Sequence, residues 1–183
     1  MAHIVGISGS LRRASFNTAL LHAAAGLTPP GSTIEIRSIA GIPLYDGDVE
    51  AGGIPDEVTA LKDAIAGADG LLIVTPEYNN SIPGVLKNGI DWLTRPPADI
   101  KRVFGGRPVA IMGATPGLGG TRLSQAAWLP VLRTLGTRPW FGSRLAVSGA
   151  RNVFNDAGDL VDDEIRLQLQ KFMTGFAAFV TGR

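Results

Sequence analysis

The chain has 183 residues, of which 24 are glycine, 12 are proline and none is cysteine. Its formal net charge is only +1, so it lacks the strong positive field typical of proteins that bind nucleic acids or anionic membranes. The absence of cysteine excludes disulfides, iron–sulfur clusters, thiolate metal sites and cysteine nucleophiles.

The apolar fraction of 45% and the charged fraction of 18% suit a globular core and argue against disorder. The length predicts a single domain over residues 1–183. No stretch approaches the ~20 consecutive apolar residues of a membrane span. The first six residues also lack the charged and apolar regions of a secretion signal, so we expect a cytoplasmic protein.

Short apolar runs at residues 4–7, 71–74 and 109–112 predict strands that are buried on both faces of a parallel sheet. Residues 33–37 alternate between polar and apolar side chains, which predicts an edge strand with one wet face. A weaker fifth strand is indicated around Trp140 and residues 145–147.

Helical patterns lie between the predicted strands. Acidic residues followed by helical spacing predict helices over residues 54–68 and 162–180. Residues 121–135 also read as a helix, in which Pro130 predicts a kink or an early end. The alternation of strand and helix predicts a doubly wound α/β fold, with long loops at residues 41–53 and 95–107.

In such folds, ligands bind beyond the carboxyl ends of the strands, so the loops there are informative. Residues 9–18 open into a helix, whose N-terminal amides can bind an anion. Arg12 or Arg13 would add a charged fork suited to phosphate. The alternative is an ordinary helix with Ser15 as its cap. Neither a Walker loop nor a Gly-x-Gly-x-x-Gly fingerprint is present, which favours a terminal phosphate monoester.

Two further loops have distinctive compositions. Residues 75–84 are densely polar and include Tyr78, and residues 113–120 contain four glycines, which let a backbone approach a flat ligand closely. The helix over residues 83–93 between them has a wide apolar arc, which fits either burial within this chain or contact with another subunit. Together the three loops predict a site for a mononucleotide with a planar ring, although a plain flexible loop is the alternative at residues 113–120.

The motifs at residues 9–17 and 76–92 resemble the NADPH-dependent FMN reductase family, a flavodoxin-like group, and the similarity extends over nearly the whole chain. The resemblance implies a flavodoxin-like, five-stranded parallel sheet of order 2-1-3-4-5 with helices on both faces. It also implies a homodimer or homotetramer. Whether Asn80 contacts the flavin or the substrate stays open. The resemblance implies the following cofactor-binding residues: Ser10, Arg12, Ser15, Phe16 and Asn17 for the FMN phosphate, and Pro76, Glu77, Tyr78, Asn79, Asn80, Thr115, Gly117, Leu118 and Gly119 for the ring.

The activity that the resemblance implies is oxidoreduction, in which bound FMN takes hydride from NADPH or NADH and passes it to a quinone or a similar small acceptor such as chromate, an azo compound or free flavin. We expect no metal and no catalytic acid or base, and we interpret His3 and His22 as structural. The alternatives are a flavodoxin-type electron carrier and a non-catalytic flavin-binding protein. Flavodoxins tend to be strongly acidic, whereas this chain is nearly neutral.

Overall fold

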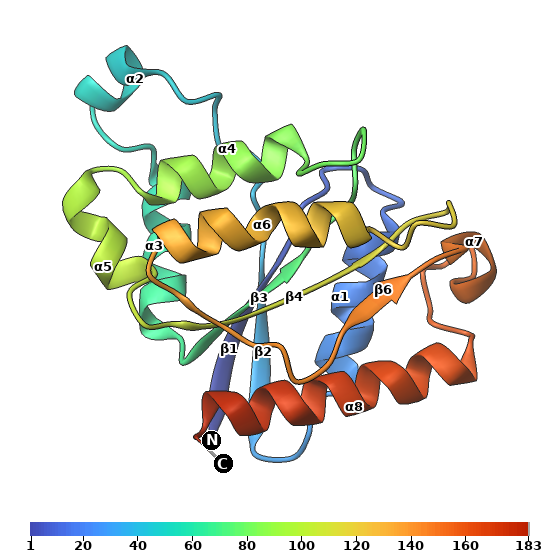
Figure 1. The fold of residues 1–183 in the computed structure, drawn as a ribbon. Helices are drawn as coiled ribbons and strands as arrows, with labels where there is room; N and C mark the ends of the chain where they lie inside the picture. Colours follow the sequence, from blue (N-terminus) through green and yellow to red (C-terminus); the bar gives the residue numbers. More distant parts are fainter. Residues whose placement is uncertain (183) are drawn as a thin grey trace.

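The apolar runs of the sequence form one parallel sheet in the computed structural model, which describes residues 1–182 (Figure 1). The strands follow the order β2-β1-β3-β4-β5, and β6 pairs with β4 beyond the end of β5. The predicted order is therefore confirmed, and two short strands share the fifth position. The strands are β1 (Ala2–Ser8), β2 (Ser32–Arg37), β3 (Gly70–Val74), β4 (Pro108–Ala114), β5 (Arg138–Pro139) and β6 (Leu145–Val147).

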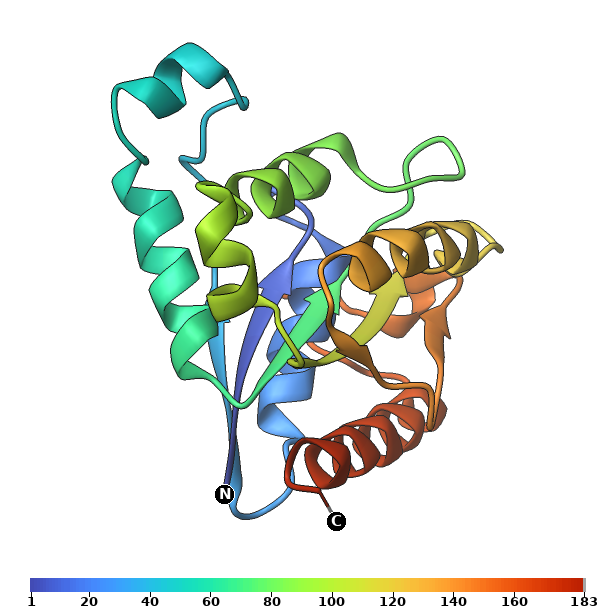
Figure 2. The same ribbon diagram turned by 60° about the vertical axis from the view of Figure 1, so that its left-hand side comes forward.

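Helices cover both faces of the sheet, as Figures 1 and 2 show, with α4 and α6 on one side and α8 on the other. The long helices lie where the hydrophobic spacing predicts them. The regions predicted as plain loops at residues 41–53 and 95–107 each contain short helices, so those two predictions were incomplete. The helices are α1 (Phe16–Gly26), α2 (Gly47–Ala51), α3 (Asp56–Gly67), α4 (Gly84–Leu93), the 3-10 helix η1 (Pro97–Asp99), α5 (Ile100–Val103), α6 (Arg122–Thr134), α7 (Ala150–Val153) and α8 (Asp163–Val180).

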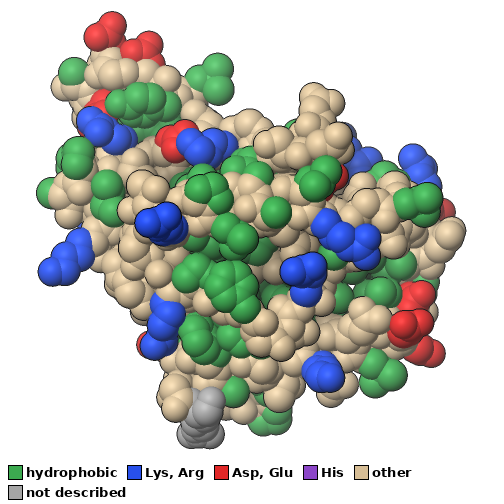
Figure 3. All heavy atoms as spheres, viewed as in Figure 1, with side chains coloured by type: hydrophobic (Ala, Val, Ile, Leu, Met, Phe, Trp, Pro, Cys, Tyr) green, Lys and Arg blue, Asp and Glu red, His purple; other side chains and the backbone are tan. Residues whose placement is uncertain are grey.

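Residues 42–53 leave the body of the molecule and return to it, carrying α2 at their tip (Figure 1). We call this segment the arm. Acidic side chains gather at its tip in Figure 3. Apolar side chains of the arm are also exposed, among them Leu44 at 82%. Most of the arm therefore lies outside the hydrophobic core of the protein.

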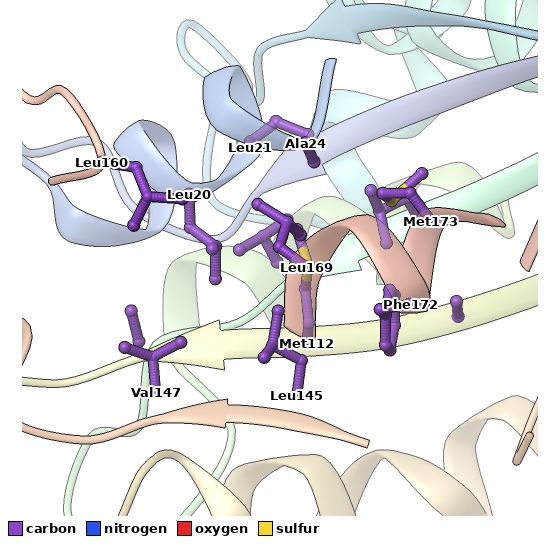
Figure 4. Packing of buried hydrophobic residues seen from close by; sticks show 14 of the residues in the cluster. Leu20, Leu21, Ala24, Met112, Leu145, Val147, Leu160, Leu169, Phe172 and Met173 are labelled. Atoms are coloured by element: carbon purple, nitrogen blue, oxygen red, sulfur yellow. The ribbon is translucent and has the colours of Figure 1, made fainter. Parts of the chain in front are cut away.

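Each central strand serves two cores because successive side chains point to opposite faces of the sheet. Ile4 and Met112 pack with α1 and α8, whereas Val5 and Leu71 pack with α3, α4 and α6. Figure 4 shows the first core, where Leu20 and Leu21 of α1 and Leu169 and Phe172 of α8 pack on the face of β4 that carries Met112. This two-sided burial explains why the runs in the sequence are continuous rather than alternating.

The apolar arc of α4 is covered by its own chain. Leu86, Ile90, Trp92 and Leu93 are all buried, and Gly89 faces Ile39 closely enough that a Cβ there would lie 3.4 Å from the Ile39 side chain. Of the two interpretations of this arc, burial within one chain is therefore the observed one. The arc gives no argument for a second subunit.

Pro130 lies inside α6, which continues to Thr134, so the helix does not end early. A proline removes the hydrogen bond to the carbonyl four residues before it, here that of Ala126. Both residues are exposed, so water can bond that carbonyl instead. None of the helices among residues 1–182 is long and apolar enough to cross a membrane.

Candidate functional site

Three loops meet at the carboxyl edge of the sheet: residues 9–15 after β1, residues 75–83 after β3 and residues 115–121 after β4. The first two are in direct contact at Gly9. A Cβ on Gly9 would lie 2.9 Å from Cδ of Pro76 and 2.6 Å from the Leu86 side chain. Because no larger residue fits there, glycine allows the first loop to lie against the second.

The first loop caps α1 and leaves amides free. Oγ of Ser15 accepts hydrogen bonds from the backbone N–H groups of Asn17 and Thr18 at 3.2 and 3.3 Å, which confirms Ser15 as the helix cap. Within residues 1–182, the amides of residues 13–16 donate no hydrogen bond to another protein group. Four adjacent free donors at the start of an eleven-residue helix are chemically suited to a phosphate, so the capped helix and the phosphate cradle are compatible.

Arg12 stands beside this cradle in a defined position. Its guanidinium carbon lies 5.6 Å from the centre of the Phe16 ring, and Phe16 stacks on Phe154 with 6.1 Å between ring centres. The backbone N–H of Arg12 donates to Oγ of Ser10 at 3.3 Å. Arg12 is exposed and forms no ion pair within residues 1–182, so its charge is available to a ligand.

Asn17 has a structural contact that the sequence did not predict. Its side-chain amide donates to the carbonyl of Ala114 and accepts from the N–H of Ala114, both at 2.9 Å. Asn17 and Ala114 are both buried. The side chain thus ties the start of α1 to the end of β4, across 97 residues of sequence.

The second loop ends in a tight two-residue turn. Tyr78 and Ser81 exchange two backbone hydrogen bonds of 3.0 and 3.2 Å, and Asn79 and Asn80 between them have φ values of 50° and 61°. Two consecutive positive φ values are typical of a type I′ turn, which asparagine tolerates better than most residues. The turn holds Tyr78 at the surface, where its side chain is 47% exposed.

Glu77 joins the second loop to α6, the helix that follows the third loop. Its Oε2 accepts hydrogen bonds from the backbone N–H groups of Leu123 at 2.9 Å and Ser124 at 3.0 Å, in the first turn of α6. Thr121, the residue that precedes α6, provides no side-chain cap. Glu77 therefore supplies the cap and places a negative charge at the positive end of the helix dipole.

The third loop depends on close backbone contacts. A Cβ on Gly113 would lie 2.2 Å from the carbonyl oxygen of Thr75 and 2.3 Å from Oγ1 of Thr121. Past this point, residues 116–119 are exposed, and the side chain of Leu118 is 90% exposed. Thr115, which is half-buried, precedes this exposed part, and its Oγ1 accepts a hydrogen bond from the N–H of Gly117 at 3.3 Å.

A buried polar group beneath these loops was missed by the sequence analysis. Oγ1 of Thr75 lies 2.9 Å from Oγ of Ser124 and accepts from the indole N–H of Trp128 at 3.1 Å. All three side chains are fully buried. The polar character of Thr75 directly after a strand was the available signal, but its partners lie 49 and 53 residues away.

All fourteen predicted site residues lie on these three connected loops or in the first turn of α1. The structure brings them to one edge, and their contact with a cofactor stays a prediction. His3 and Glu35 lie elsewhere and are 3.1 Å apart across β1 and β2. The edge offers a set of free amides suited to a phosphate, an exposed aromatic side chain and an exposed, glycine-rich segment over residues 116–119.

Comparison with known proteins gives a consistent result. The model of the family described as NADPH-dependent FMN reductase matches residues 2–152. An NAD(P)H-dependent FMN reductase of Pseudomonas aeruginosa is 44% identical over 97% of this chain and 94% of its own length. A 2-hydroxy-1,4-benzoquinone reductase of a Burkholderia species is 41% identical over 98% and 97%. FerB, a flavoenzyme NAD(P)H:(acceptor) oxidoreductase from Paracoccus denitrificans, matches in structure with a TM-score of 0.89 and 31% identity, over 100% of this chain and 98% of that one.

Proposed function

The chain belongs to the NADPH-dependent FMN reductase family, and from that premise we propose that it oxidises NAD(P)H with bound FMN and reduces quinones. The observation that carries this proposal is that the loops after β1, β3 and β4 meet at one edge of the sheet. A mononucleotide needs a phosphate site and a ring site at a fixed separation, and such an edge can provide both. The naming of a similar protein as a 2-hydroxy-1,4-benzoquinone reductase supports a quinone as the acceptor.

The first loop would hold the phosphate of FMN. The free amides of residues 13–16 supply donors, Ser10 adds a hydroxyl and Arg12 adds a permanent positive charge. Asn17 acts on this site through Ala114, by fixing where the cradle lies relative to β4. Phosphate recognition therefore rests mainly on backbone groups and one arginine.

The second and third loops would flank the isoalloxazine ring. When bound, FMN supplies the hydride and electron transfer, which no side chain of this chain can perform. Glu77 is held by two backbone amides, so it is a positioning residue rather than a free base. The part of the site formed by residues 76–80 and 115–119 orients the ring and leaves one side open to the nucleotide and the acceptor in turn.

The central experiment mixes the purified, FMN-loaded protein with NADPH or NADH without oxygen. A reductase loses its yellow colour rapidly by a two-electron reduction and regains it when a quinone such as 1,4-benzoquinone is added. A protein that is reduced only by a partner protein would instead be an electron carrier. A colourless protein that cannot be reconstituted with FMN would contradict the whole proposal.

The phosphate cradle is tested separately by Arg12→Ala. Loss of a charge-assisted contact weakens FMN binding by about 1.5–3 kcal/mol, measured as the dissociation constant in a fluorescence titration. Arg144→Ala is the matched control, because Arg144 is an exposed arginine on a different surface, between β5 and β6. If Arg12→Ala and Arg144→Ala give the same dissociation constant as the unmodified protein, Arg12 has no role in phosphate binding.

We also propose that the protein forms a homodimer or homotetramer, an expectation that rests on family resemblance. The apolar face of α4 lends no support, since it is buried within one chain. Light scattering on the FMN-loaded protein would settle the mass. A monomer at all concentrations would contradict this part of the proposal.

A further inference from the structure

A hollow of about 720 Å³ lies next to the phosphate cradle, on the outer side of α1. It shares Arg12, Ser15 and Phe16 with the cradle and extends to α7 and the segment after it. Its volume falls within the ~300–1,000 Å³ of typical small-molecule sites. The remaining lining residues are Arg13, Ala14, Thr18, Ala19, His22, Arg151 and residues 154–159.

Two arginines from different elements border this hollow without protein partners. Arg13 comes from the loop after β1, and Arg151 comes from α7. Both are exposed, and within residues 1–182 neither forms an ion pair or donates a side-chain hydrogen bond. Guanidinium groups bind phosphate through paired N–H donors, so the two together suit a doubly charged phosphate.

The acidic groups of the hollow lie in the turn over residues 155–159, which follows α7 and Arg151 along the chain. Asp159 accepts a hydrogen bond from the amide of Asn155 at 3.1 Å, and its backbone N–H donates to the same side chain at 2.8 Å. Asp156 is the second carboxylate, and His22 on α1 is the remaining titratable group. Phosphate and carboxylates repel each other, so an anion is favoured on the side of the arginines.

The hollow is fixed relative to the predicted ring site. The N–H of Gly149 donates to the carbonyl of Gly117 at 3.1 Å, and the N–H of Ala150 donates to the carbonyl of Thr115 at 3.0 Å. These bonds attach the start of α7 to the third loop of the site. Arg151 follows directly, so its distance from the ring-binding loop is set by backbone contacts.

We propose that this hollow binds the adenosine half of NADPH, with Arg13 and Arg151 holding its 2′-phosphate. The proposal rests on the proposed function, which places the nicotinamide at the flavin ring. The rest of the nucleotide must then leave the ring site, and the hollow is a space with unpaired positive charge that adjoins the phosphate cradle of the same site. NADPH and NADH differ only in the 2′-phosphate, so these two arginines make the enzyme select NADPH.

The first test measures kcat/KM for NADPH and for NADH with the FMN-loaded enzyme and a quinone. Arg151→Ala and Arg13→Ala each lower the NADPH/NADH ratio of kcat/KM by about tenfold, the loss expected for one charge-assisted contact. Arg151→Lys restores part of the ratio, because it keeps the charge without the fork. Arg144→Ala, which removes the same charge from another surface, leaves the ratio unchanged.

A second test measures binding without turnover. Calorimetry on the FMN-loaded enzyme compares adenosine 2′,5′-bisphosphate with 5′-AMP, which lacks the 2′-phosphate. We expect the bisphosphate to bind about tenfold more tightly, and Arg151→Ala to remove that difference.

The proposal is overturned if the two nucleotides bind equally, or if the ratio survives both substitutions. Failure to reduce the flavin with either coenzyme would instead contradict the proposed function. The calorimetric comparison remains decisive for the hollow in that case.

Discussion

Glu77 and Glu50 each bridge two donors, but they belong to regions that are held together in different ways. Glu77, at the carboxyl edge of the sheet, accepts from two backbone amides in the first turn of α6. Glu50, in the arm, accepts from the hydroxyl of Tyr45 and from Nε of Arg95, both at 2.8 Å. The first contact completes a helix, whereas the second joins side chains at the surface.

The other contacts of the two regions differ in the same way. At the edge, buried groups such as Asn17 and Ala114 satisfy each other, and an unpaired partner would be costly there. The arm is attached by Tyr45, whose ring meets that of Trp92 edge-on at 5.1 Å, and by hydrogen bonds from the side chains of Trp92 and Asn88 to the carbonyl of Pro43 at 2.9 and 2.8 Å. One partly exposed ion pair, between Glu50 and Arg95, adds to these contacts. Water and salt weaken such pairs. The edge is therefore held by buried contacts to backbone groups, whereas part of the attachment of the arm is sensitive to salt.

The largest expected effect is that of Gly113→Ala. The new methyl group would overlap the carbonyl oxygen of Thr75 at 2.2 Å, so β3, β4 or the start of α6 must move. We expect the free energy of unfolding to fall by about 3 kcal/mol, the upper end for overpacking, as measured by urea denaturation of the FMN-free protein.

Gly117→Ala is the matched control for that experiment. The nearest atom to a Cβ at Gly117 is Oγ1 of Thr115, at 3.8 Å, an ordinary contact distance. Its effect on unfolding should stay below about 0.5 kcal/mol. Equal effects at the two glycines would show that the edge is less tightly packed than its distances indicate.

Asn17→Ala should be next in size. The substitution leaves the N–H and the carbonyl of Ala114 buried and unpaired, which costs about 2–3 kcal/mol of unfolding free energy. Asn17→Asp keeps an acceptor for the Ala114 N–H but cannot donate to the Ala114 carbonyl and faces it with a buried negative charge, so it should not restore the lost stability. Asn152→Ala, at an exposed asparagine, controls for the change of residue type. A loss of under 0.5 kcal/mol, roughly the scale of a surface change, would argue against the bridge.

Glu77→Ala removes a helix cap and should destabilise by about 1–2 kcal/mol in the same assay. Glu77→Gln retains an acceptor oxygen but not the charge, so it should recover part of that loss. If alanine and glutamine behave alike and neither destabilises, the link between the second and third loops does not contribute to stability.

Glu50→Gln in the arm should give the smallest effect and a distinctive pH dependence. Hydrogen bonds from Arg95 and Tyr45 hold the pKa of Glu50 below its usual value. A carboxyl group whose pKa is lowered by folding stabilises the protein above its unfolded pKa, and that contribution disappears as pH falls through the folded pKa. The difference between the two proteins should therefore be present at neutral pH, shrink in acid and shrink with added salt. A difference that persists in acid or in high salt would contradict this account of the arm.

The main elements of the fold were predictable because each has a local pattern. Continuous apolar runs gave β1, β3 and β4, and helical spacing with an acidic first turn gave α3 and α8. The location of the site followed from a general property of parallel sheets, whose ligands bind beyond the carboxyl ends of the strands. The first turn of α1 could be predicted in both ways, from its local helix-start pattern and from its position beyond the carboxyl end of β1.

What could not be predicted depends on contacts between distant parts of the chain. Nothing near Glu77 in the sequence indicates that it caps a helix starting 45 residues later. Nothing near Asn17 indicates that its side chain also binds the backbone of Ala114. The short helices of the arm and of residues 97–103 have too few residues to show a period. Whether α6 would pass through Pro130 depended on exposure, which only the fold reveals.

The amide pair between Asn17 and Ala114 has a consequence for ligand choice. These two hydrogen bonds fix the distance between the phosphate cradle and the loop that would contact the ring. Neither the cradle nor the loop can move relative to the other without breaking these hydrogen bonds, so the site would select its ligand by length. A flavin whose chain between ring and phosphate is one carbon longer or shorter would fit either the phosphate cradle or the ring site, but not both at once.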